Sequence, residues 1–368
     1  MFSPAKSRLF VAIGLYTIAF LHYLGDDILL KRLMDLVEGK KVFLGTHWDA
    51  DGIASGAIIY HLIKDKAKSI RTLSKGDVFL IEKKDVPEDC DVVICTDIHA
   101  GSDIDKPVIY IDHHPVENGD HKQDYALMIH DKDAQSCTTV IWEKLIKGTD
   151  EPYFIFLTLL GFFGDGGSNK EMPHELELKA MGAFPELMVR KQSYYDDSEY
   201  LVLERYVSSL NVGKRVHWSG QVPLELFKAI ESWEPFVYNT HPLAQELQNL
   251  RYELRDLYKM PVNIKNLPHL DYIQIDCDKN IQGVLCAKHM KEKPIIVMNK
   301  YNDSIMGSMR VPDDIDFDAG IYLESFNEKI SGFVGGGHER AGGFTLPIAE
   351  LKQFMALLKE HHKVVKNI

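Results

Sequence analysis

Residues 111–115 read Ile-Asp-His-His-Pro, and residues 47–52, further upstream, read His-Trp-Asp-Ala-Asp-Gly. In both runs, histidine and aspartate side chains follow an apolar stretch that is rich in β-branched residues. Short apolar stretches of this kind are typical of buried strands. Imidazoles and carboxylates together are common ligands of divalent metals. The two runs therefore predict an α/β sheet with a metal site at one edge.

The apolar pattern around these runs alternates between strand-like and helix-like segments. We expect strands at residues 41–45, 91–95 and 108–111, and helices at residues 27–37, 52–63, 136–146 and 151–163. Strands that alternate with helices predict a parallel sheet. Because ligands bind beyond the carboxyl ends of such strands, the polar runs lie where a site is expected.

The second half of the chain has a different pattern. Residues 175–258 have helical spacing, mixed charge and no cluster of metal ligands, which predicts a helical connector. Beyond it we expect strands at residues 272–275, 294–298 and 304–311, a helix at 317–329, a glycine-rich loop at 331–338 and a C-terminal helix from about residue 348.

These segments predict a two-domain α/β protein. We expect a helical leader at residues 1–40, a parallel-sheet catalytic domain at 41–174, the helical connector at 175–268 and a smaller α/β substrate-binding domain at 269–368. We expect the active site in the cleft between the two α/β domains.

The composition limits the class of protein. The chain has 368 residues, enough for about two domains. Its formal net charge of −12 argues against a general nucleic-acid binder, since phosphate contacts come from clustered lysine and arginine. A polyanionic substrate must then be held locally, by metals and a few cations; the alternative is that the charge serves solubility alone. Five cysteines without a C-x-x-C pair predict reduced thiols in a cytoplasmic protein.

An apolar run at residues 9–24 follows Lys6 and Arg8. It is short for a membrane-spanning helix, and no small-residue cleavage site follows it. Three interpretations stay open: a packed helix, a membrane anchor, or an extension that precedes the natural start. Association with a membrane is therefore not the first expectation, although this run leaves it open.

The polar residues at the expected strand and helix ends form one candidate site. Side chains at i, i+2 and i+4 of an extended segment point the same way, so His47, Asp49 and Asp51 can converge. With the ends of two more strands and of the apolar helix, the set has five carboxylates and three imidazoles: His47, Asp49, Asp51, Asp97, Asp112, His113, His114 and Asp165. Without cations these carboxylates would repel and raise one another's pKa values, whereas two divalent ions would stabilise them.

The ligand types select among metals. The set contains no cysteine, which argues against a thiolate zinc site. Carboxylates mixed with imidazoles suit Mn²⁺, with Mg²⁺, Co²⁺ and Fe²⁺ as alternatives. Two such ions about 3.5–4 Å apart are a standard device of phosphoryl hydrolysis. The sequence therefore predicts a dinuclear metallohydrolase.

Other polar residues have simpler interpretations. Residues 136–139 either meet a substrate at a helix N-terminus or form a plain N-cap at Ser136. Eight further histidines are expected to be surface or capping residues: His121, His130, His174, His217, His241, His289 and the pair at 361–362.

In four motifs, taken in order, the chain resembles the DHH phosphoesterases: H-x-D-A-D-G at 47–52, Asp97, D-H-H at 112–114 and Gly164-Asp165. That superfamily includes RecJ-type exonucleases, among them archaeal RecJ-like nucleases, as well as oligoribonucleases, cyclic-dinucleotide phosphodiesterases and family II pyrophosphatases. The resemblance implies a parallel-sheet DHH domain.

The C-terminal part resembles the DHH-associated domain of the nuclease branch. The motifs that carry this resemblance are G-S-M-R at 307–310, G-G-G-H at 335–338 and A-G-G-F at 341–344. Family II pyrophosphatases have a different second domain, so the nuclease and oligoribonuclease branch is favoured.

The resemblance implies a role for each residue. One metal would be held by His47, Asp49 and Asp97, and the other by Asp51, Asp97, His113 and Asp165, with Asp97 bridging. Asp112 would orient a ligand imidazole, and His114 would lie near the substrate phosphate as a proton donor. Arg310 and His338 would grip the substrate, and the glycines at 335–337, among them Gly336 and Gly337, would let backbone N–H groups approach a phosphate.

The function expected first is that of a Mn²⁺-dependent exonuclease that hydrolyses single-stranded DNA or RNA. Its partner would be single-stranded nucleic acid or a short oligonucleotide, with a DNA-repair or replication protein as a further candidate. The second domain shows no long basic track, which favours the alternative of a small-nucleotide phosphodiesterase or phosphatase, that is, an oligoribonuclease on short RNA or an enzyme for dinucleotides, cyclic dinucleotides or 3′-phosphoadenosine 5′-phosphate. A third hypothesis is a non-catalytic module that assists a helicase or replication factor; the complete ligand set argues against it.

Overall fold

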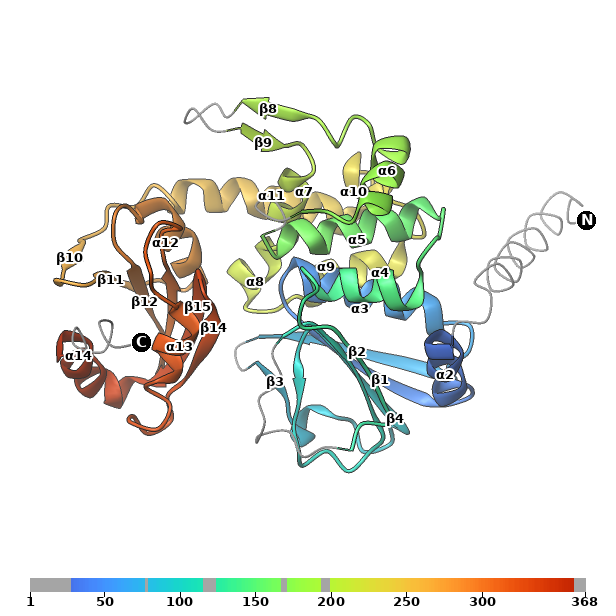
Figure 1. Cartoon of the computed structure of the whole chain (residues 1–368), viewed down its shortest axis with the longest axis horizontal. Helices are drawn as coiled ribbons and strands as arrows, with labels where there is room; N and C mark the ends of the chain where they lie inside the picture. The colour runs from blue at the N-terminus through green and yellow to red at the C-terminus, as the bar shows by residue number, and fades with distance from the viewer. Residues whose placement is uncertain (1–27, 77–78, 115–123, 167–170, 193–198, 361–368) are drawn as a thin grey trace, which may run out of the picture. The chain divides into compact units, whose positions relative to one another are not determined.

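The computed structural model describes residues 28–76, 79–114, 124–166, 171–192 and 199–360 (Figure 1). It divides into two compact units, the first formed by residues 1–211 and 220–245 and the second by residues 212–219 and 246–368. The segment expected as a connector contributes residues to both units.

The apolar run at residues 9–24 lies outside the described residues, so its three interpretations stay predictions. Within the part of the chain that the structure describes, no helix is long and apolar enough to cross a membrane.

The first unit is built around a five-stranded parallel sheet in the order β2-β1-β4-β6-β7. The strands are β1 (Lys41–His47), β2 (Ser69–Lys75), β4 (Val92–Thr96), β6 (Val108–Asp112) and β7 (Leu127–His130). The predicted parallel sheet is confirmed, and β1, β4 and β6 lie where strands were expected. These three strands are buried on both faces and read as continuous apolar runs, whereas the edge strand β2 is mostly polar and gave no such signal.

Helices cover one face of this sheet (Figure 1). α3 (Ala50–Ile63) packs on β1, α4 (Cys137–Leu145) packs on β6, and α5 (Pro152–Gly164) packs across both helices. α5 is buried along almost its whole length, which is why its sequence is apolar all round. α2 (Ile28–Val37) packs beside α4 and β7.

A smaller layer covers the opposite face of the sheet. β3 (Leu80–Ile81) pairs in parallel with β5 (His99–Ala100), and the short 3-10 helix η1 (Lys83–Asp85) follows β3. Alternate side chains of the central strands, among them Phe43, Val93 and Tyr110, pack into the core under this layer.

The remaining elements of the first unit lie between residues 174 and 237. They are α6 (His174–Ala183), β8 (Arg190–Gln192), β9 (Glu199–Leu201), α7 (Glu204–Leu210), α9 (Gln221–Ala229) and α10 (Glu234–Val237). The expectation of an all-helical segment is wrong at β8 and β9, which form an antiparallel pair. The three residues of β8 are exposed and polar, so no apolar alternation marked this strand.

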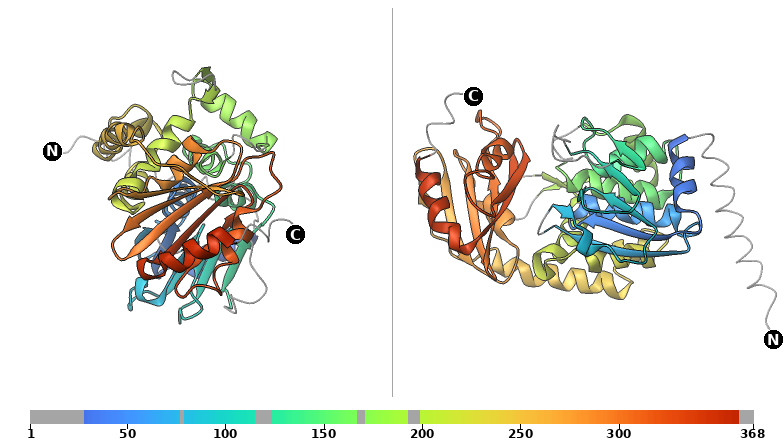
Figure 2. Two further views of the ribbon diagram at one scale, coloured as in Figure 1. Left: turned by 90° about the vertical axis from the view of Figure 1, so that its left-hand side faces the viewer. Right: turned by 90° about the horizontal axis from the view of Figure 1, so that it is seen from below.

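The second unit contains a six-stranded mixed sheet in the order β10-β11-β12-β13-β15-β14 (Figure 2). Its strands are β10 (Lys265–Asn266), β11 (Asp271–Asp276), β12 (Ile295–Tyr301), β13 (Ser304–Arg310), β14 (Val334–His338) and β15 (Ala341–Pro347). β11 and β12 are parallel, and the other neighbours are antiparallel. The expected separate α/β domain at the C-terminal side is confirmed.

Helices pack on both faces of this second sheet. One core includes side chains of α13 (Ala319–Glu324) and α14 (Leu351–Glu360), and α14 follows the 3-10 helix η3 (Ile348–Glu350). The other core includes side chains of α8 (Val212–His217), α11 (Pro242–Leu257) and α12 (Gln282–His289).

The prediction of a glycine-rich loop at 331–338 is wrong, because most of that segment is the strand β14, paired with β15. Glycine is needed at residue 337 of this strand, because its φ is 145° and a Cβ atom there would come 2.5 Å from the carbonyl oxygen of Ala341 in β15. Glycines have no side chains to alternate in polarity, so the strand period could not be read from them.

Candidate metal centre

Eight residues that were predicted as a site lie at the carboxyl edge of the parallel sheet or on the adjoining helix ends. They are His47, Asp49, Asp51, Asp97, Asp112, His113, His114 and Asp165. Asp49 is the N-cap of α3 and Asp165 is the C-cap of α5. The geometry of a parallel sheet therefore brings together residues that are far apart in the sequence.

Asp97 lies at the centre of this group. It follows β4 with a backbone φ of 58°, in the left-handed region that non-glycine residues rarely adopt. Its backbone N–H donates to the carbonyl of Ile111, at 3.0 Å, which ties this turn to β6. Its Oδ1 atom is buried and accepts no hydrogen bond from the described residues. A buried carboxylate oxygen without a donor is what a bound cation would satisfy.

The first group of candidate ligands consists of His47, Asp49 and Asp97. The Nδ1 atom of His47 lies 2.9 Å from Asp49 Oδ2 and 3.5 Å from Asp97 Oδ2. The other oxygen of Asp49 caps α3 by accepting from the N–H of Gly52, at 3.1 Å. This cap fixes the carboxylate while one oxygen still faces the imidazole.

The second group surrounds the Nε2 atom of His113. That atom lies 3.9 Å from an oxygen of Asp51, 3.7 Å from one of Asp97 and 3.8 Å from one of Asp165. These separations are too long for hydrogen bonds, but ligand atoms about 2 Å from one ion can lie up to about 4 Å from each other. Nδ1 of the same ring donates to the carbonyl of Ala134, at 3.3 Å, which leaves the lone pair on Nε2. The donor set therefore fits a divalent ion.

The N-terminus of α4 holds the carboxylate of Asp51. The N–H groups of Cys137 and Thr138 donate to its two oxygens, at 2.6 and 3.0 Å. Ser136 is the N-cap of this helix, so the plain-cap interpretation of residues 136–139 is confirmed. The first N–H groups of α4 are thus occupied by Asp51.

A close approach of α5 to α3 and α4 completes this wall of the site. A Cβ atom at Gly161 would lie 2.2 Å from Thr138 Oγ1 and 2.4 Å from Asp51 Oδ1. One at Gly164 would lie 2.7 Å from the Cβ atom of Ala50. Only glycine lets the end of α5, and with it Asp165, come this near. Gly161 has a role in the site that the sequence analysis missed.

Burial and crowding make the carboxylates hard to ionise together. Burial raises the pKa of Asp51 to about 7, the charges of Asp165 and Asp49 add to this shift, and the two N–H groups of α4 oppose it. Burial also raises the pKa of Asp97 well above its usual value, and its carboxylate neighbours raise it further. A divalent cation would remove this repulsion.

Asp112 behaves differently, although it is fully buried. Its Oδ1 accepts from the backbone N–H groups of His113 (2.6 Å) and His114 (3.1 Å) and from His114 Nδ1 (2.7 Å), and its Oδ2 accepts from the hydroxyl of Tyr110 (2.7 Å). Burial alone would raise its pKa, but the charge and the hydrogen bond of His114 lower it below the usual range. Burial lowers the pKa of His114 in turn, but Asp112 outweighs this effect and raises it to about 9.

Three residues near the site were missed or misread from the sequence. Tyr110 precedes Asp112 by two residues in β6, so the period of a strand could have pointed to it, whereas His99 follows the left-handed turn at Asp97 and has no such signal. The interpretation of His130 as a surface or capping residue is wrong, because its Nε2 atom donates to the carbonyl of His114, at 2.7 Å.

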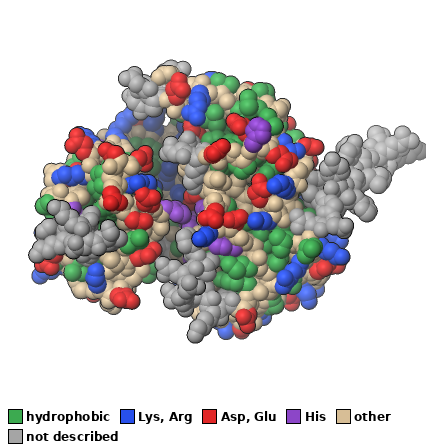
Figure 3. All heavy atoms as spheres, viewed as in Figure 1, with side chains coloured by type: hydrophobic (Ala, Val, Ile, Leu, Met, Phe, Trp, Pro, Cys, Tyr) green, Lys and Arg blue, Asp and Glu red, His purple; other side chains and the backbone are tan. Residues whose placement is uncertain are grey.

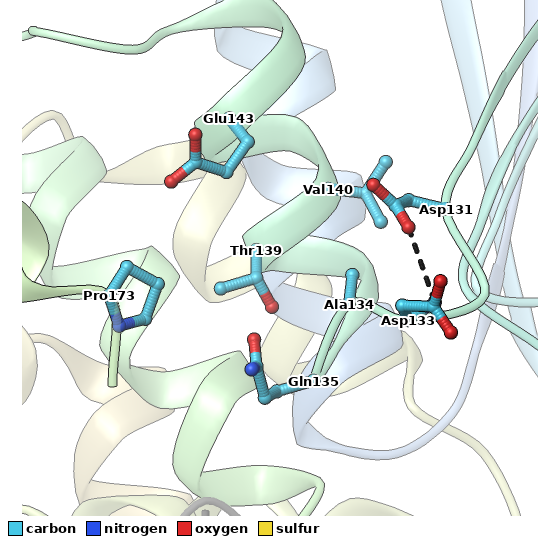
Figure 4. Close-up of a pocket in the computed structure, with 8 residues that line it drawn as sticks. All are labelled: Asp131, Asp133, Ala134, Gln135, Thr139, Val140, Glu143 and Pro173. Carbon is cyan, nitrogen blue, oxygen red and sulfur yellow. Dashed lines mark hydrogen bonds between the residues drawn. The ribbon is translucent and has the colours of Figure 1, made fainter. Parts of the chain in front are cut away.

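A pocket of about 200 Å³ lies beside α4 and contains none of the predicted ligands (Figure 4). Asp131, Asp133 and Glu143 line it, and Asp131 also lies 3.2 Å from the ammonium group of Lys144. Its acidic residues therefore belong to a solvated rim outside the two ligand groups.

In the second unit, the structure places the predicted substrate residues at one level of the sheet. Arg310 in β13 and His338 in β14 are both paired with Ala341 of the strand between them. The guanidinium of Arg310 donates to Ser308 Oγ, at 3.3 Å, and to the carbonyl of Met309, at 2.8 Å. Burial lowers its pKa, and no carboxylate of the described residues forms an ion pair with it. Gly336 and Gly337 lie beside His338 in β14.

Two family models match the chain. The DHH family, N-terminal domain, matches residues 41–161, and the DHHA1 domain matches residues 275–366. The chain therefore belongs to the DHH superfamily, with a DHHA1 domain on its C-terminal side. Members of the DHH family are metal-dependent phosphoesterases. No curated protein sequence matches the chain.

Solved structures share the fold. The exonuclease RecJ bound to manganese matches with a TM-score of 0.61 and 17% identity, over 93% of this chain and 94% of that chain. RecJ of Thermus thermophilus in complex with Mn²⁺ matches with a TM-score of 0.59 and 16% identity, over 91% of this chain and 54% of that chain. This chain therefore spans about half the length of that RecJ. The DHH domain of a member of a family of ribosomal proteins has a TM-score of 0.60 and 15% identity, over 94% of this chain and 92% of that chain. The fold is thus RecJ-like.

The raised pKa of Asp51 makes the effect of metal on stability depend on pH. In the metal-free protein, the folded state holds a proton on Asp51 up to about pH 7, whereas the unfolded chain releases it near 3.8. The stability contributed by this proton is fully present below the unfolded pKa and is lost as the pH rises through the folded pKa. A bound cation replaces the proton. We expect saturating Mn²⁺ to raise the Tm more at about pH 8 than at about pH 5.5. An equal or smaller increment at the higher pH would contradict this model.

Gly161→Ala tests the close approach of α5. The new Cβ atom would overlap Asp51 and Thr138, so we expect a loss of about 1–3 kcal/mol in the free energy of unfolding and weaker metal binding. Urea denaturation and metal titration measure the two effects. Gly182→Ala in α6 is the control, because a Cβ atom there meets nothing within 4 Å. Wild-type metal affinity in the Gly161 variant would mean that the site does not need this contact.

Proposed function

We propose that the protein is a Mn²⁺-dependent phosphodiester hydrolase, an exonuclease that acts on single-stranded DNA or RNA. The observation that carries this proposal is the position of Asp97, whose Oδ2 lies 3.5 Å from Nδ1 of His47 and whose Oδ1 lies 3.7 Å from Nε2 of His113, so that it adjoins both groups of candidate ligands. A carboxylate within reach of two neighbouring ions can bridge them. The RecJ structures of similar fold contain manganese in two cases and Mg²⁺ in a third, which supports a divalent metal here.

The ligand groups divide between two ions. His47, Asp49 and Asp97 would hold one, and Asp51, Asp97, His113 and Asp165 would hold the other. Such ions lower the pKa of a water molecule and neutralise charge on the attacked phosphate. Mixed carboxylate and imidazole ligands favour Mn²⁺, with Mg²⁺ and Co²⁺ as alternatives.

His114 is the candidate proton donor. Its Nδ1 atom is held by Asp112, so Nε2 points away from that carboxylate. In the metal-free protein Asp112 raises the pKa of this imidazole to about 9, which favours a protonated ring that could donate to a departing oxygen. Asp112 accepts three hydrogen bonds on Oδ1 and one on Oδ2, so in this proposal it orients histidines instead of binding metal.

The second unit would bind the substrate through Arg310, Gly336, Gly337 and His338. The charge of Arg310 has no carboxylate partner among the described residues, which suits a phosphate. Its position level with His338 would let two cationic or donor groups meet one backbone segment.

Charge favours a second candidate, hydrolysis of small nucleotides such as dinucleotides, cyclic dinucleotides or 3′-phosphoadenosine 5′-phosphate. The net charge is −12, and Figure 3 shows basic side chains interspersed with acidic ones on the visible face. A substrate with few phosphates needs only the local cations of the site.

Two further expectations stay predictions. A cytoplasmic location is supported by five cysteines, none of which is in a disulfide. A DNA-repair or replication protein remains a proposed partner. The alternative of a non-catalytic module is disfavoured because the expected ligands are complete.

A substrate panel with Mn²⁺ tests the function. It compares single-stranded DNA and RNA labelled at the 5′ or 3′ end with dinucleotides, cyclic dinucleotides and 3′-phosphoadenosine 5′-phosphate, resolved by product length. Stepwise shortening of the long strands supports the exonuclease, and cleavage of the small compounds alone supports the second candidate. If no substrate is cleaved with any divalent metal, both enzymatic candidates fail and the hypothesis of a non-catalytic module is favoured.

Asp97→Asn tests the shared ligand. We expect activity to fall by more than about a hundredfold and the bound metal to decrease, because the amide carries no charge to offer to either ion. The metal-free variant should be at least as stable as the wild type at neutral pH, since a crowded buried carboxylate has been removed. Activity, metal content and Tm are measured together. Asp133→Asn, in the exposed rim, is the control and should match the wild type; full activity in Asp97→Asn would refute the shared ligand.

A further inference from the structure

A chain of hydrogen bonds runs from His114 into the core of the first unit. His114 Nδ1 lies 2.7 Å from Asp112 Oδ1, and the hydroxyl of Tyr110 lies 2.7 Å from Asp112 Oδ2. The same hydroxyl lies 3.0 Å from Nδ1 of His99, in β5. The chain thus joins β6 to the small sheet that covers the opposite face.

The direction of each bond follows from the donors available. The hydroxyl of Tyr110 has one hydrogen, and it donates that hydrogen to Asp112. The phenolic oxygen must therefore accept from His99, so Nδ1 of His99 carries a hydrogen. Nδ1 of His114 likewise donates to the carboxylate. Every donor in the chain points toward Asp112, and this fixes the tautomers of both imidazoles.

Burial makes the hydroxyl of Tyr110 important to Asp112. Both residues are fully buried, and among the described residues the hydroxyl of Tyr110 is the donor to Oδ2 of Asp112. A buried carboxylate oxygen that loses its donor pays the full cost of desolvation, so the carboxylate would turn or shift to recover one. Any such movement would be passed to His114 through Oδ1.

Packing holds the two ends of the chain as well. The ring of Phe79 lies edge-on to His114, with centroids 4.7 Å apart, and edge-on to His99, at 5.3 Å. The ring of His99 also stacks on Tyr110, at 6.0 Å. Phe79 leads into β3, which pairs with β5 at His99, so the same small sheet positions the phenyl ring and the imidazole.

We propose that Tyr110 and His99 are positioning residues that hold Asp112, and through it His114, in one orientation toward the substrate. The inference rests on the function proposed above, in which His114 faces the phosphate. Neither Tyr110 nor His99 touches the substrate; both act through the carboxylate.

Tyr110→Phe against Tyr125→Phe is the decisive comparison. Tyr125 stacks on Tyr110 with centroids 5.0 Å apart, but its hydroxyl is buried and makes no hydrogen bond with the described residues. Each variant removes one hydroxyl from the same stack. We expect kcat to fall about tenfold in Tyr110→Phe, with KM and bound metal unchanged, because one hydrogen bond to a charged group is lost. Tyr125→Phe should match the wild type. Equal kcat values in the two variants, or a loss of kcat that follows a loss of metal, would overturn the proposal.

A pair of variants at His99 keeps the test open if Tyr110→Phe does not fold. His99→Asn retains an N–H donor near the position of Nδ1, and His99→Leu removes it. We expect the asparagine variant to retain most of the kcat of the wild type and the leucine variant to lose it, at unchanged KM. The same kcat in both would count against a role of this hydrogen bond.

Nuclear magnetic resonance of the metal-free, ¹⁵N-histidine-labelled protein separates this inference from the proposed function. We expect the Nδ1–H signal of His114 to move in Tyr110→Phe and to stay in Tyr125→Phe. If the wild type cleaves nothing in the substrate panel, the proposed function fails, whatever this signal does. If the wild type is active and the signal is the same in both variants, the function stands and the positioning role fails.

Discussion

Repulsion among buried carboxylates is the constraint on which the first unit depends. Asp51 and Asp97 are almost without solvent, and each has other carboxylates beside it, so neither ionises at its usual pH. The protein offsets part of this cost with the first N–H groups of α4, which hold Asp51. A divalent cation would offset the remainder. The left-handed turn at Asp97 and the close contact at Gly161 are needed because they keep these groups together despite the repulsion.

Asp112 shows that burial alone does not decide what a carboxylate does. It lies in the same region as Asp97 and is equally buried, yet its pKa shifts in the opposite direction. The difference lies in the neighbours: the charge and the hydrogen bond of His114 lower the pKa of Asp112, whereas the carboxylates beside Asp97 raise its pKa, and one oxygen of Asp97 accepts no hydrogen bond from the described residues. A carboxylate whose lone pairs are filled can orient imidazoles, and one with an unfilled oxygen can meet a cation. The D-H-H run therefore contains residues of different kinds.

The sequence predicted those parts of the fold in which the polarity of the side chains follows their burial. β1, β4 and β6 are buried on both faces and were found as apolar runs, and the polar residues at their ends led to the ligands. β8 is short and exposed, and β14 is largely glycine, so neither showed an alternation of polar and apolar side chains. Tyr110 was missed because a tyrosine inside an apolar strand looks like core until its hydroxyl is seen to reach Asp112. Contacts between different strands cannot be predicted from the periodicity of one short segment.

The backbone at residue 97 limits which amino acids evolution can place there. A φ of 58° is tolerated by glycine, asparagine and aspartate, and strains longer or branched side chains. Of these three residues only aspartate carries a charge, so even glutamate, with the same chemistry, would meet a conformational barrier. A substitution that keeps the negative charge at this position therefore strains the turn, and one that keeps the turn unstrained loses the charge.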